Sequence, residues 1–294
     1  MVHRAEPAVA AAGVIAIESL DDPRTAEYRL ISRPAALARA GLFVAEGRLV
    51  LRRLAERSQF RIKSVLLSDT ARAALDDVVS RLDPAVPVYV TSQAVISALV
   101  GFQIHRGCLA LVERPRLARV DEIDFSTARR LVVLEGVSNP DNVGGIFRSA
   151  AAFGVDAVLL GPDCGDPLYR KAIRTSMAGT LQVPFCAAMP WPQSLSTLGT
   201  RGFQVIGLTP ASDARSLDEC GGKIERLALV LGAEGEGLSA GALAAVDQRV
   251  RIPMRGPADS LNVTVAASIA LWHFDHRRNR SSGLHREIRE IRED

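Results

Sequence analysis

A polar turn directly after a short apolar run is the most chemically suggestive stretch of this 294-residue chain. The run is Leu131–Leu134, and it leads into Asn-Pro-Asp-Asn-Val-Gly-Gly and a helical pattern that carries Arg148. Arg148 is the only lysine or arginine between Arg130 and Arg170, so a single cation dominates this turn. A strand, a polar turn and a helix are how α/β proteins place chemistry at the carboxyl ends of their strands.

Two later turns have the same form. Leu227–Leu231 is an apolar run that leads into Gly-Ala-Glu-Gly-Glu-Gly at residues 232–237. Further on, Val250–Met254 leads through a polar stretch into Ser-Leu-Asn-Val-Thr-Val-Ala at residues 260–266. Glycine lets a ligand or another segment approach the backbone closely, and the acidic and amide side chains supply hydrogen-bonding groups. One such turn is weakly informative, whereas three in this order are specific.

Taken together, the three segments resemble motifs 1, 2 and 3 of the SpoU (TrmH-like) RNA ribose 2′-O-methyltransferases, within the SPOUT superfamily. The resemblance is close over residues 128–276 and looser before them. It implies an α/β catalytic domain with a mostly parallel sheet and a trefoil knot, preceded by a small L30e-like α/β domain. It also implies S-adenosylmethionine as the cofactor, no metal, an RNA substrate and a homodimer.

The resemblance also supplies the candidate catalytic residues, which are Arg148, Asn142, Glu234, Ser260 and Asn262. A guanidinium is a poor base at neutral pH. We therefore favour a role for Arg148 in binding the phosphate beside the target ribose and lowering the pKa of the 2′-hydroxyl. The alternatives are a general base and a surface arginine paired with a carboxylate. Glu234 could accept a proton or orient Arg148 or the ribose, and Asn262 could equally cap the last helix.

The implied cofactor-binding residues are Leu208, Thr209, Gly232, Ile252 and Leu261. Methyl transfer from a sulfonium mainly needs alignment and a deprotonated nucleophile. Ile252 and Leu261 could hold an adenine between them, with backbone amides reading its polar edge, and Gly232 would allow a close approach of the backbone. The alternative is that all five are ordinary core and turn residues.

The composition is that of a folded globular protein, and its charge is spread unevenly along the chain. Hydrophobic residues make up 48% and charged residues 23% of the chain, which has room for two domains of ordinary size. Residues 1–120 carry 17 Lys or Arg against 12 Asp or Glu, whereas residues 121–294 carry 19 against 21. The basic front half favours RNA contact, and the alternative is a chance excess on a solvated surface.

The cysteines and the apolar runs indicate a cytoplasmic protein that does not enter a membrane. The four cysteines show no C-x-x-C spacing, which argues against a structural zinc site or a disulfide framework. No apolar run approaches the ~20 residues that span a membrane. The apolar stretch Ala8–Ile17 follows Arg4, but Glu6 and Pro7 interrupt the basic flank that a signal peptide would have.

The pattern of elements predicts five segments. They are a disordered start (1–17), a small α/β domain (18–113), a linker (114–128), a larger α/β domain (129–277) and a charged tail (278–294). The family resemblance implies that the first domain is L30e-like and binds the RNA substrate, and that the second is the knotted catalytic domain. In the first domain, where Glu46 also fits the resemblance, we expect strands at 62–67, 86–90 and 107–112 and helices at 71–82 and 92–100. In the second we expect a closing helix at 263–274 and strands at 131–134, 155–160, 182–185, 203–208, 227–231 and 249–253.

The predicted function is transfer of a methyl group from S-adenosylmethionine to a ribose 2′-hydroxyl of structured RNA. The extra amino-terminal domain favours ribosomal over transfer RNA, and Trp272 and Phe274 on the last helix are candidate dimer contacts. An alternative is an RNA-binding protein of the same fold that has lost catalysis. A Rossmann-type oxidoreductase is a third reading, and the lack of Gly-x-Gly-x-x-Gly after the first strand opposes it. The target nucleotide is not encoded in lists of side chains.

Overall fold

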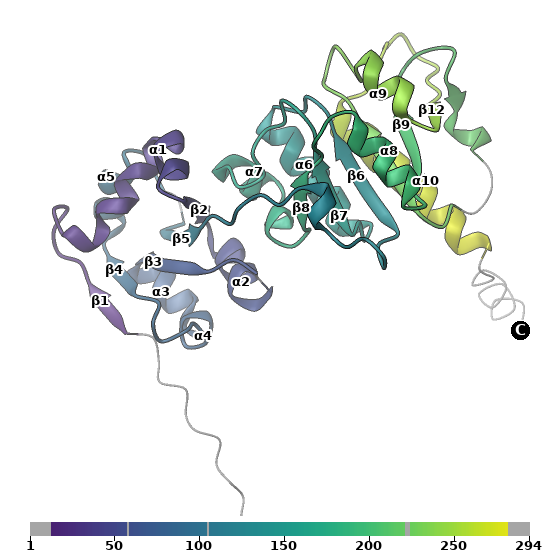
Figure 1. The fold of residues 1–294 in the computed structure, drawn as a ribbon. Coiled ribbons are helices and arrows are strands. Elements are labelled where there is room, and N and C mark those ends of the chain that lie inside the picture. Colours follow the sequence, from purple (N-terminus) through teal and green to yellow (C-terminus); the bar gives the residue numbers. More distant parts are fainter. Residues whose placement is uncertain (1–12, 58, 105, 221–223, 282–294) are drawn as a thin grey trace, which may run out of the picture. The chain divides into compact units, whose positions relative to one another are not determined.

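The computed structural model describes residues 13–57, 59–104, 106–220 and 224–281, and it divides the chain into two compact units (Figure 1). Unit 1 comprises the residues up to Arg116 together with Leu168–Gln182. Unit 2 comprises Leu117–Pro167 and the residues from Val183 onward. Each unit has its own sheet, and each is α/β. None of the helices in the described part of the chain is both long and apolar enough to cross a bilayer.

The sheet of unit 1 has five strands in the order β1-β4-β3-β5-β2. Strands β1, β4 and β3 run parallel to one another, and β5 is antiparallel to both β3 and β2. Their bounds are β1 (Val14–Ala16), β2 (Leu42–Glu46), β3 (Ile62–Ser68), β4 (Val88–Thr91) and β5 (Cys108–Glu113). Runs of consecutive buried residues in β3 and β5 show that both faces of these strands are covered.

The helices of unit 1 begin and end at recognisable signals. Ser68 and Ser92 cap α3 and α5 by accepting hydrogen bonds from backbone amides, and Gly101 ends α5 in a left-handed conformation (φ 80°). The helical elements are η1 (Pro23–Ser32), α1 (Pro34–Arg39), α2 (Arg48–Arg57), α3 (Asp69–Ala74), α4 (Asp76–Val79), α5 (Gln93–Val100), α7 (Arg170–Thr175) and η3 (Gly179–Leu181).

Two predictions for unit 1 need correction. The helix expected over residues 71–82 is two short helices, because the fully buried Leu75 leaves helical geometry (φ −124°) between them. The disordered start expected over residues 1–17 is ordered from Val14, because β1 hydrogen-bonds to β4 along its length. Residues 1–12 of that predicted segment lie outside the described residues.

The sheet of unit 2 has seven strands, and all of its pairings are parallel, as the apolar runs predict. The order is β10-β12-β9-β11-β6-β7-β8. The bounds are β6 (Arg130–Leu134), β7 (Ala157–Leu160), β8 (Phe185–Ala187), β9 (Gln204–Leu208), β10 (Arg215–Ser216), β11 (Leu227–Leu231) and β12 (Gln248–Arg251). The strand expected at 182–185 starts later because Pro184, which has no amide hydrogen, precedes it.

Two long helices pack against each other beside this sheet. Helix α6 (Pro140–Ala152) contacts α10 (Val263–Ser281), and a Cβ atom at Gly145 would lie only 2.5 Å from Thr264 Cγ2. The hydroxyls of Ser149 and Ser268 are 2.8 Å apart across the same contact. Small residues thus bring α6 and α10, and the turns that precede them, close together. The other helical elements of unit 2 are η2 (Val120–Glu122), α8 (Gln193–Thr200), η4 (Leu217–Glu219) and α9 (Ala240–Ala245).

The predicted boundaries between segments differ from the observed ones. Within the expected linker 114–128, Val120 and Phe125 are buried in the core of unit 2, and Arg201 Nη1 donates to the Val120 carbonyl (3.0 Å). Most of this stretch is therefore part of unit 2. The expected closing helix 263–274 continues to residue 281, which takes in the start of the predicted tail. Residues 282–294 of that tail lie outside the described residues.

Residues 168–182, predicted as part of the catalytic domain, belong by their contacts to unit 1. Helix α7 lies against β2, and Arg170 Nη1 is 2.8 Å from Glu46 Oε2. The guanidinium of Arg170 also lies 4.1 Å from the ring centroid of Phe102. Because the Glu46 side chain is only 10% exposed, Arg170 supplies the cation that a buried carboxylate needs.

Candidate functional site

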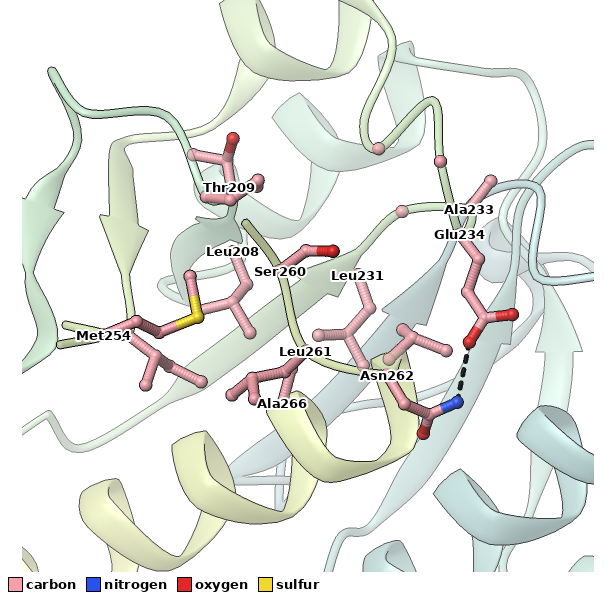
Figure 2. A pocket seen from close by; sticks show the side chains of 16 residues that line it. Leu208, Thr209, Leu231, Ala233, Glu234, Met254, Ser260, Leu261, Asn262 and Ala266 are labelled. Carbon is pink, nitrogen blue, oxygen red and sulfur yellow. Dashed lines mark hydrogen bonds between the residues drawn. The ribbon is translucent and has the colours of Figure 1, made fainter. Parts of the chain in front are cut away.

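A cavity of about 370 Å³ lies in unit 2 where three parallel strands end (Figure 2). Leu208 is the last residue of β9 and Leu231 the last of β11, and Ile252 follows β12 directly. The volume is within the range of small-molecule sites, and the carboxyl edge of a parallel sheet is where such sites form. Its walls are Leu208, Thr209, Pro210, Leu231, Gly232, Ala233, Glu234, Gly235, Gly237, Ile252, Met254, Ser260, Leu261, Asn262, Val263 and Ala266.

One wall is the loop of residues 232–239, here called the glycine-rich loop. Ala233 and Gly237 exchange two backbone hydrogen bonds, of 3.2 and 3.0 Å, which fold the loop back on itself. Gly235 (φ 91°) and Gly237 (φ 72°) are in the left-handed region that favours glycine. A Cβ atom at Gly232 would lie 2.2 Å from the carbonyl carbon of Gly237 and 2.4 Å from the amide nitrogen of Leu238. No residue other than glycine fits at position 232 without moving this loop.

The cavity has an apolar side and a polar side. Figure 2 shows Leu208, Met254 and Leu261 gathered on one side, with Glu234 and Asn262 together on the other. Such a division suits a ligand with a flat apolar part and a charged or polar part. All five residues predicted to bind the cofactor line the cavity, and their binding role stays a prediction.

A hydrogen-bond network joins the three predicted motifs at the polar side. Asn262 Nδ2 donates to Asn142 Oδ1 (2.9 Å) and to Glu234 Oε1 (2.6 Å). Asn262 Oδ1 accepts from the backbone amide of Thr264 (3.0 Å) and so caps α10. The helix cap considered for Asn262 is thus present, and its catalytic role stays a prediction. Asn142, only 7% exposed, also accepts a bond at its carbonyl from Thr264 Oγ1 (3.3 Å).

The remaining two predicted catalytic residues differ in their positions. Ser260 lines the cavity. Arg148 does not, because it lies about 9 Å along the axis of α6 from Asn142 and its side chain is exposed to solvent. Among the described residues Arg148 has neither a hydrogen bond nor an ion pair, so the alternative of a carboxylate-paired surface arginine does not describe it. Its guanidinium is available to an anion outside the cavity.

Sequence reasoning missed several wall residues. Met254 lies just beyond the end of β12, and Leu231 is the last residue of β11. The rule that side chains at the carboxyl ends of parallel strands converge would have found both. Among the residues described, no three His, Cys, Asp or Glu side chains are grouped as a metal site requires.

Comparisons with known proteins agree with this geometry. The sequence model of the SpoU rRNA methylase family matches residues 129–272. An uncharacterized tRNA/rRNA methyltransferase of Mycobacterium bovis is 41% identical over 261 residues, which cover 86% of this chain and 88% of that protein. The 23S rRNA (guanosine(2553)-2′-O)-methyltransferase RlmP of Bacillus subtilis is 27% identical over 258 residues, covering 88% and 98% of the two chains.

The fold is also that of a solved structure. The crystal structure of an AdoMet-bound rRNA methyltransferase from Sinorhizobium meliloti superposes with a TM-score of 0.76, at 22% identity, over 90% of this chain and 98% of that one. The identity with the mycobacterial protein over most of both chains is the stronger finding. The family resemblance of the three motifs is thereby confirmed, and the chain belongs to the SpoU family of RNA methyltransferases.

Proposed function

We propose that the protein transfers a methyl group from S-adenosylmethionine to a ribose 2′-hydroxyl of structured RNA, with ribosomal RNA as the substrate. The observation that carries the proposal is the network in which Asn262 joins Asn142 and Glu234 beside a half-apolar cavity. RlmP, named for 2′-O-methylation of 23S rRNA, and the AdoMet-bound relative support the choice of substrate and cofactor.

The residues of the cavity fit this cofactor. Leu208, Ile252 and Leu261 offer apolar surface for an adenine, and the glycine-rich loop brings backbone groups to the wall without side chains in the way. Glu234 places a carboxylate on the polar side, where it attracts the positive charge of a sulfonium. When bound, S-adenosylmethionine supplies an electrophilic methyl group, so the protein has only to orient the ribose and accept its proton.

Glu234 and Arg148 divide the remaining tasks. Glu234 Oε1 is held by Asn262, which leaves Oε2 to accept the proton of the 2′-hydroxyl. Arg148, exposed and without a partner among the described residues, binds the adjoining phosphate from outside the cavity. The nearby positive charge favours the ionised hydroxyl and thus lowers the pKa of the nucleophile.

Unit 1 is proposed to hold the RNA beyond the target nucleotide. Five of its exposed arginines have a guanidinium with no hydrogen bond or ion pair within the described ranges: Arg33, Arg39, Arg53, Arg106 and Arg174. Other cations of this unit are paired with carboxylates, as Arg52 is with Asp77. Unpaired surface arginines suit phosphate contacts, which position RNA without reading its sequence.

The 2′-O assignment is tested by labelling RNA with tritiated S-adenosylmethionine and then hydrolysing it with alkali. A 2′-O-methyl group blocks the hydroxyl that cleaves the strand, so the expected label is in alkali-resistant dinucleotides from ribosomal RNA taken from cells that lack this protein. Label in mononucleotides would mean base methylation. Label confined to transfer RNA would overturn the proposal that ribosomal RNA is the substrate. RNA and cofactor binding without transfer would favour an RNA-binding protein that has lost catalysis.

The substitution Asn262→Asp tests the hydrogen-bond network of Asn262 while keeping its role as the cap of α10. The aspartate keeps an oxygen for the amide of Thr264, but it places a second carboxylate where Asn262 Nδ2 now lies 2.6 Å from Glu234. Repulsion between the carboxylates should slow single-turnover methyl transfer by about two orders of magnitude, comparable to the loss of one oriented donor. Asn262→Ala, the control, should also lose about 1 kcal/mol of unfolding free energy with the cap. Unchanged transfer in Asn262→Asp would remove the network from the mechanism.

The proposed homodimer uses the exposed face of α10. Val265 is 46% exposed and Trp272, two turns later on the same face, is 54% exposed. Phe274, named with Trp272 as a candidate contact, is only 9% exposed and packs in the core instead. Trp272→Asp should give a monomer in analytical ultracentrifugation where the wild type is a dimer, because it places a charge in an apolar contact. A Phe274→Asp variant cannot replace this test, because it would unfold the core. If Trp272→Asp remains a dimer, the exposed face of α10 is not the dimer interface.

A further inference from the structure

We propose that Glu135 is a positioning residue whose carboxylate fixes the glycine-rich loop in the shape that binds the cofactor. Glu135 immediately follows β6 and is only 8% exposed. It does not line the cavity, and none of the three motifs includes it. The inference rests on the proposed function, because it assigns the cavity to S-adenosylmethionine.

Every oxygen of this carboxylate has a donor. Glu135 Oε1 accepts from Trp191 Nε1 (2.7 Å) and from Ser239 Oγ (2.6 Å), and Oε2 accepts from the backbone amide of Ser239 (2.9 Å). Hydrogen bonds to an ionised acceptor are roughly twice as strong as neutral ones. Ser239 is hydrogen-bonded to Glu135 through both its backbone amide and its hydroxyl, and these two bonds fix the position and the orientation of this residue.

Ser239 is the last residue of the glycine-rich loop and the N-cap of α9. Its hydroxyl donates to Glu135 and accepts from the amide of Ala242 (3.2 Å), so loop and helix are held at one point. The other end of the loop continues from β11, a central strand of the sheet. The loop is therefore anchored at both ends, and the cavity wall lies between the two anchors.

Trp191 gives the carboxylate a rigid support on its other side. The indole lies against Gly161, where a Cβ atom would be 3.2 Å from the ring. Trp191 also packs against the core of unit 2. Glu135 thus links the position of a packed tryptophan to the carboxyl end of the glycine-rich loop.

This anchor matters for binding because a loop that is ordered beforehand loses no conformational entropy when the ligand arrives. Glutamine at position 135 would keep the shape of glutamate but replace one acceptor oxygen with an amide group. That amide would face the N–H of Ser239, or both donors at Oε1, so at least one bond to Ser239 or Trp191 is lost. A loosened loop should then bind the cofactor more weakly even though the fold survives.

The test is calorimetric titration of the wild type and of Glu135→Gln, Ser239→Ala and their double variant with S-adenosylmethionine. Each single variant should raise Kd about tenfold, the usual size for a hydrogen bond to a charged group. The double variant should be little worse than either, because both remove the same anchor. Wild-type affinity in a folded Glu135→Gln, or fully additive losses in the double variant, would overturn the proposal.

Two control variants distinguish the positioning role of Glu135 from an effect of lower stability and from a direct effect of the cavity wall. Asp247→Ala removes another hydrogen bond of unit 2, from the Val205 amide to Asp247 Oδ2 (2.7 Å) at the strand ends opposite the cavity, and should lower Tm without changing Kd. A Kd that rises there in proportion to the fall in Tm would overturn the role of Glu135. Ile252→Asn, in the cavity wall, should weaken binding. If Ile252→Asn loses affinity for the cofactor and Glu135→Gln does not, the positioning role of Glu135 is wrong but the cavity assignment stands. If Ile252→Asn binds the cofactor as the wild type does, the cavity assignment is wrong, and the role of Glu135 falls with it.

A spectroscopic measurement tests the contact directly. The chain has two tryptophans, so a Trp272→Phe background leaves Trp191 as the only indole emitter. Glu135→Gln in this background should shift the emission of Trp191, because the indole N–H loses an ionised acceptor, while far-ultraviolet circular dichroism stays unchanged. An identical emission spectrum would overturn the contact on which the proposal depends.

Discussion

Gly232→Ala is expected to abolish measurable binding of S-adenosylmethionine. The added methyl group would lie 2.2 Å from the carbonyl carbon of Gly237 and 2.4 Å from its oxygen, well inside contact distance. Both are backbone atoms, so the clash can be relieved only by displacing the glycine-rich loop that forms one wall of the cavity. Overpacking of this kind costs about 1–3 kcal/mol of unfolding free energy, and the displaced wall should raise Kd at least about 100-fold, equivalent to about 2.7 kcal/mol. Calorimetry and thermal unfolding measure the two effects.

Gly199→Ala is the matched control for this substitution. It makes the same chemical change in unit 2, on α8, where a Cβ atom would meet nothing within 4 Å. Alanine is the better helix former, so stability should stay the same or rise by about 1 kcal/mol or less. Cofactor binding should not change. Wild-type affinity in Gly232→Ala would show that the loop can move without consequence and that the cavity is not the cofactor site.

Arg148→Ala is expected to slow methyl transfer by about 10²–10³-fold, the effect of removing a group that stabilises charge in the transition state. Kd for S-adenosylmethionine should be unchanged, because Arg148 does not line the cavity. Affinity for the RNA substrate should fall and its salt dependence should weaken, since one phosphate contact is lost. Arg148→Lys should recover part of the rate, because it keeps the charge but not the planar fork.

Arg129→Ala is a suitable comparison because its exposed side chain lies at the opposite end of β6 from the cavity. Rate, cofactor affinity and RNA affinity should all remain at wild-type values in this variant. Retained transfer in Arg148→Ala would remove the arginine from the mechanism, and a large rise in its cofactor Kd would assign it to the cofactor instead.

The sequence predicts the sheet of unit 2 well because strands buried on both faces of a parallel sheet consist of continuous apolar runs. Leu227–Leu231 is observed with the predicted bounds, and the run Leu131–Leu134 lies within β6. The candidate catalytic residues Asn142, Glu234 and Asn262 follow the strand-like runs of the three motifs, and the structure brings their side chains together. The trefoil knot and the L30e-like character of unit 1 stay predictions.

Other features depend on tertiary contacts that leave no local pattern. Glu135 is a single glutamate after a strand, and its role is visible only when Trp191 and Ser239, distant in sequence, are brought to it. The solvent-facing position of Arg148, in contrast, agrees with the helical period of the buried residues Val143, Ile146, Phe147 and Ala150. Nothing in the sequence of residues 168–182 indicates that the segment packs with unit 1.

The membership of residues 168–182 in unit 1 bears on how such a two-unit protein arises and on the fragments into which it can be divided. A domain appended by a single gene fusion is joined to its host at one junction, but this chain changes unit three times, after Arg116, Pro167 and Gln182. A fragment that ends at Arg116 would leave Glu46 buried without Arg170 and would uncover β2. The amino-terminal unit is therefore not a detachable module, because residues 168–182 complete it from within the sequence of unit 2.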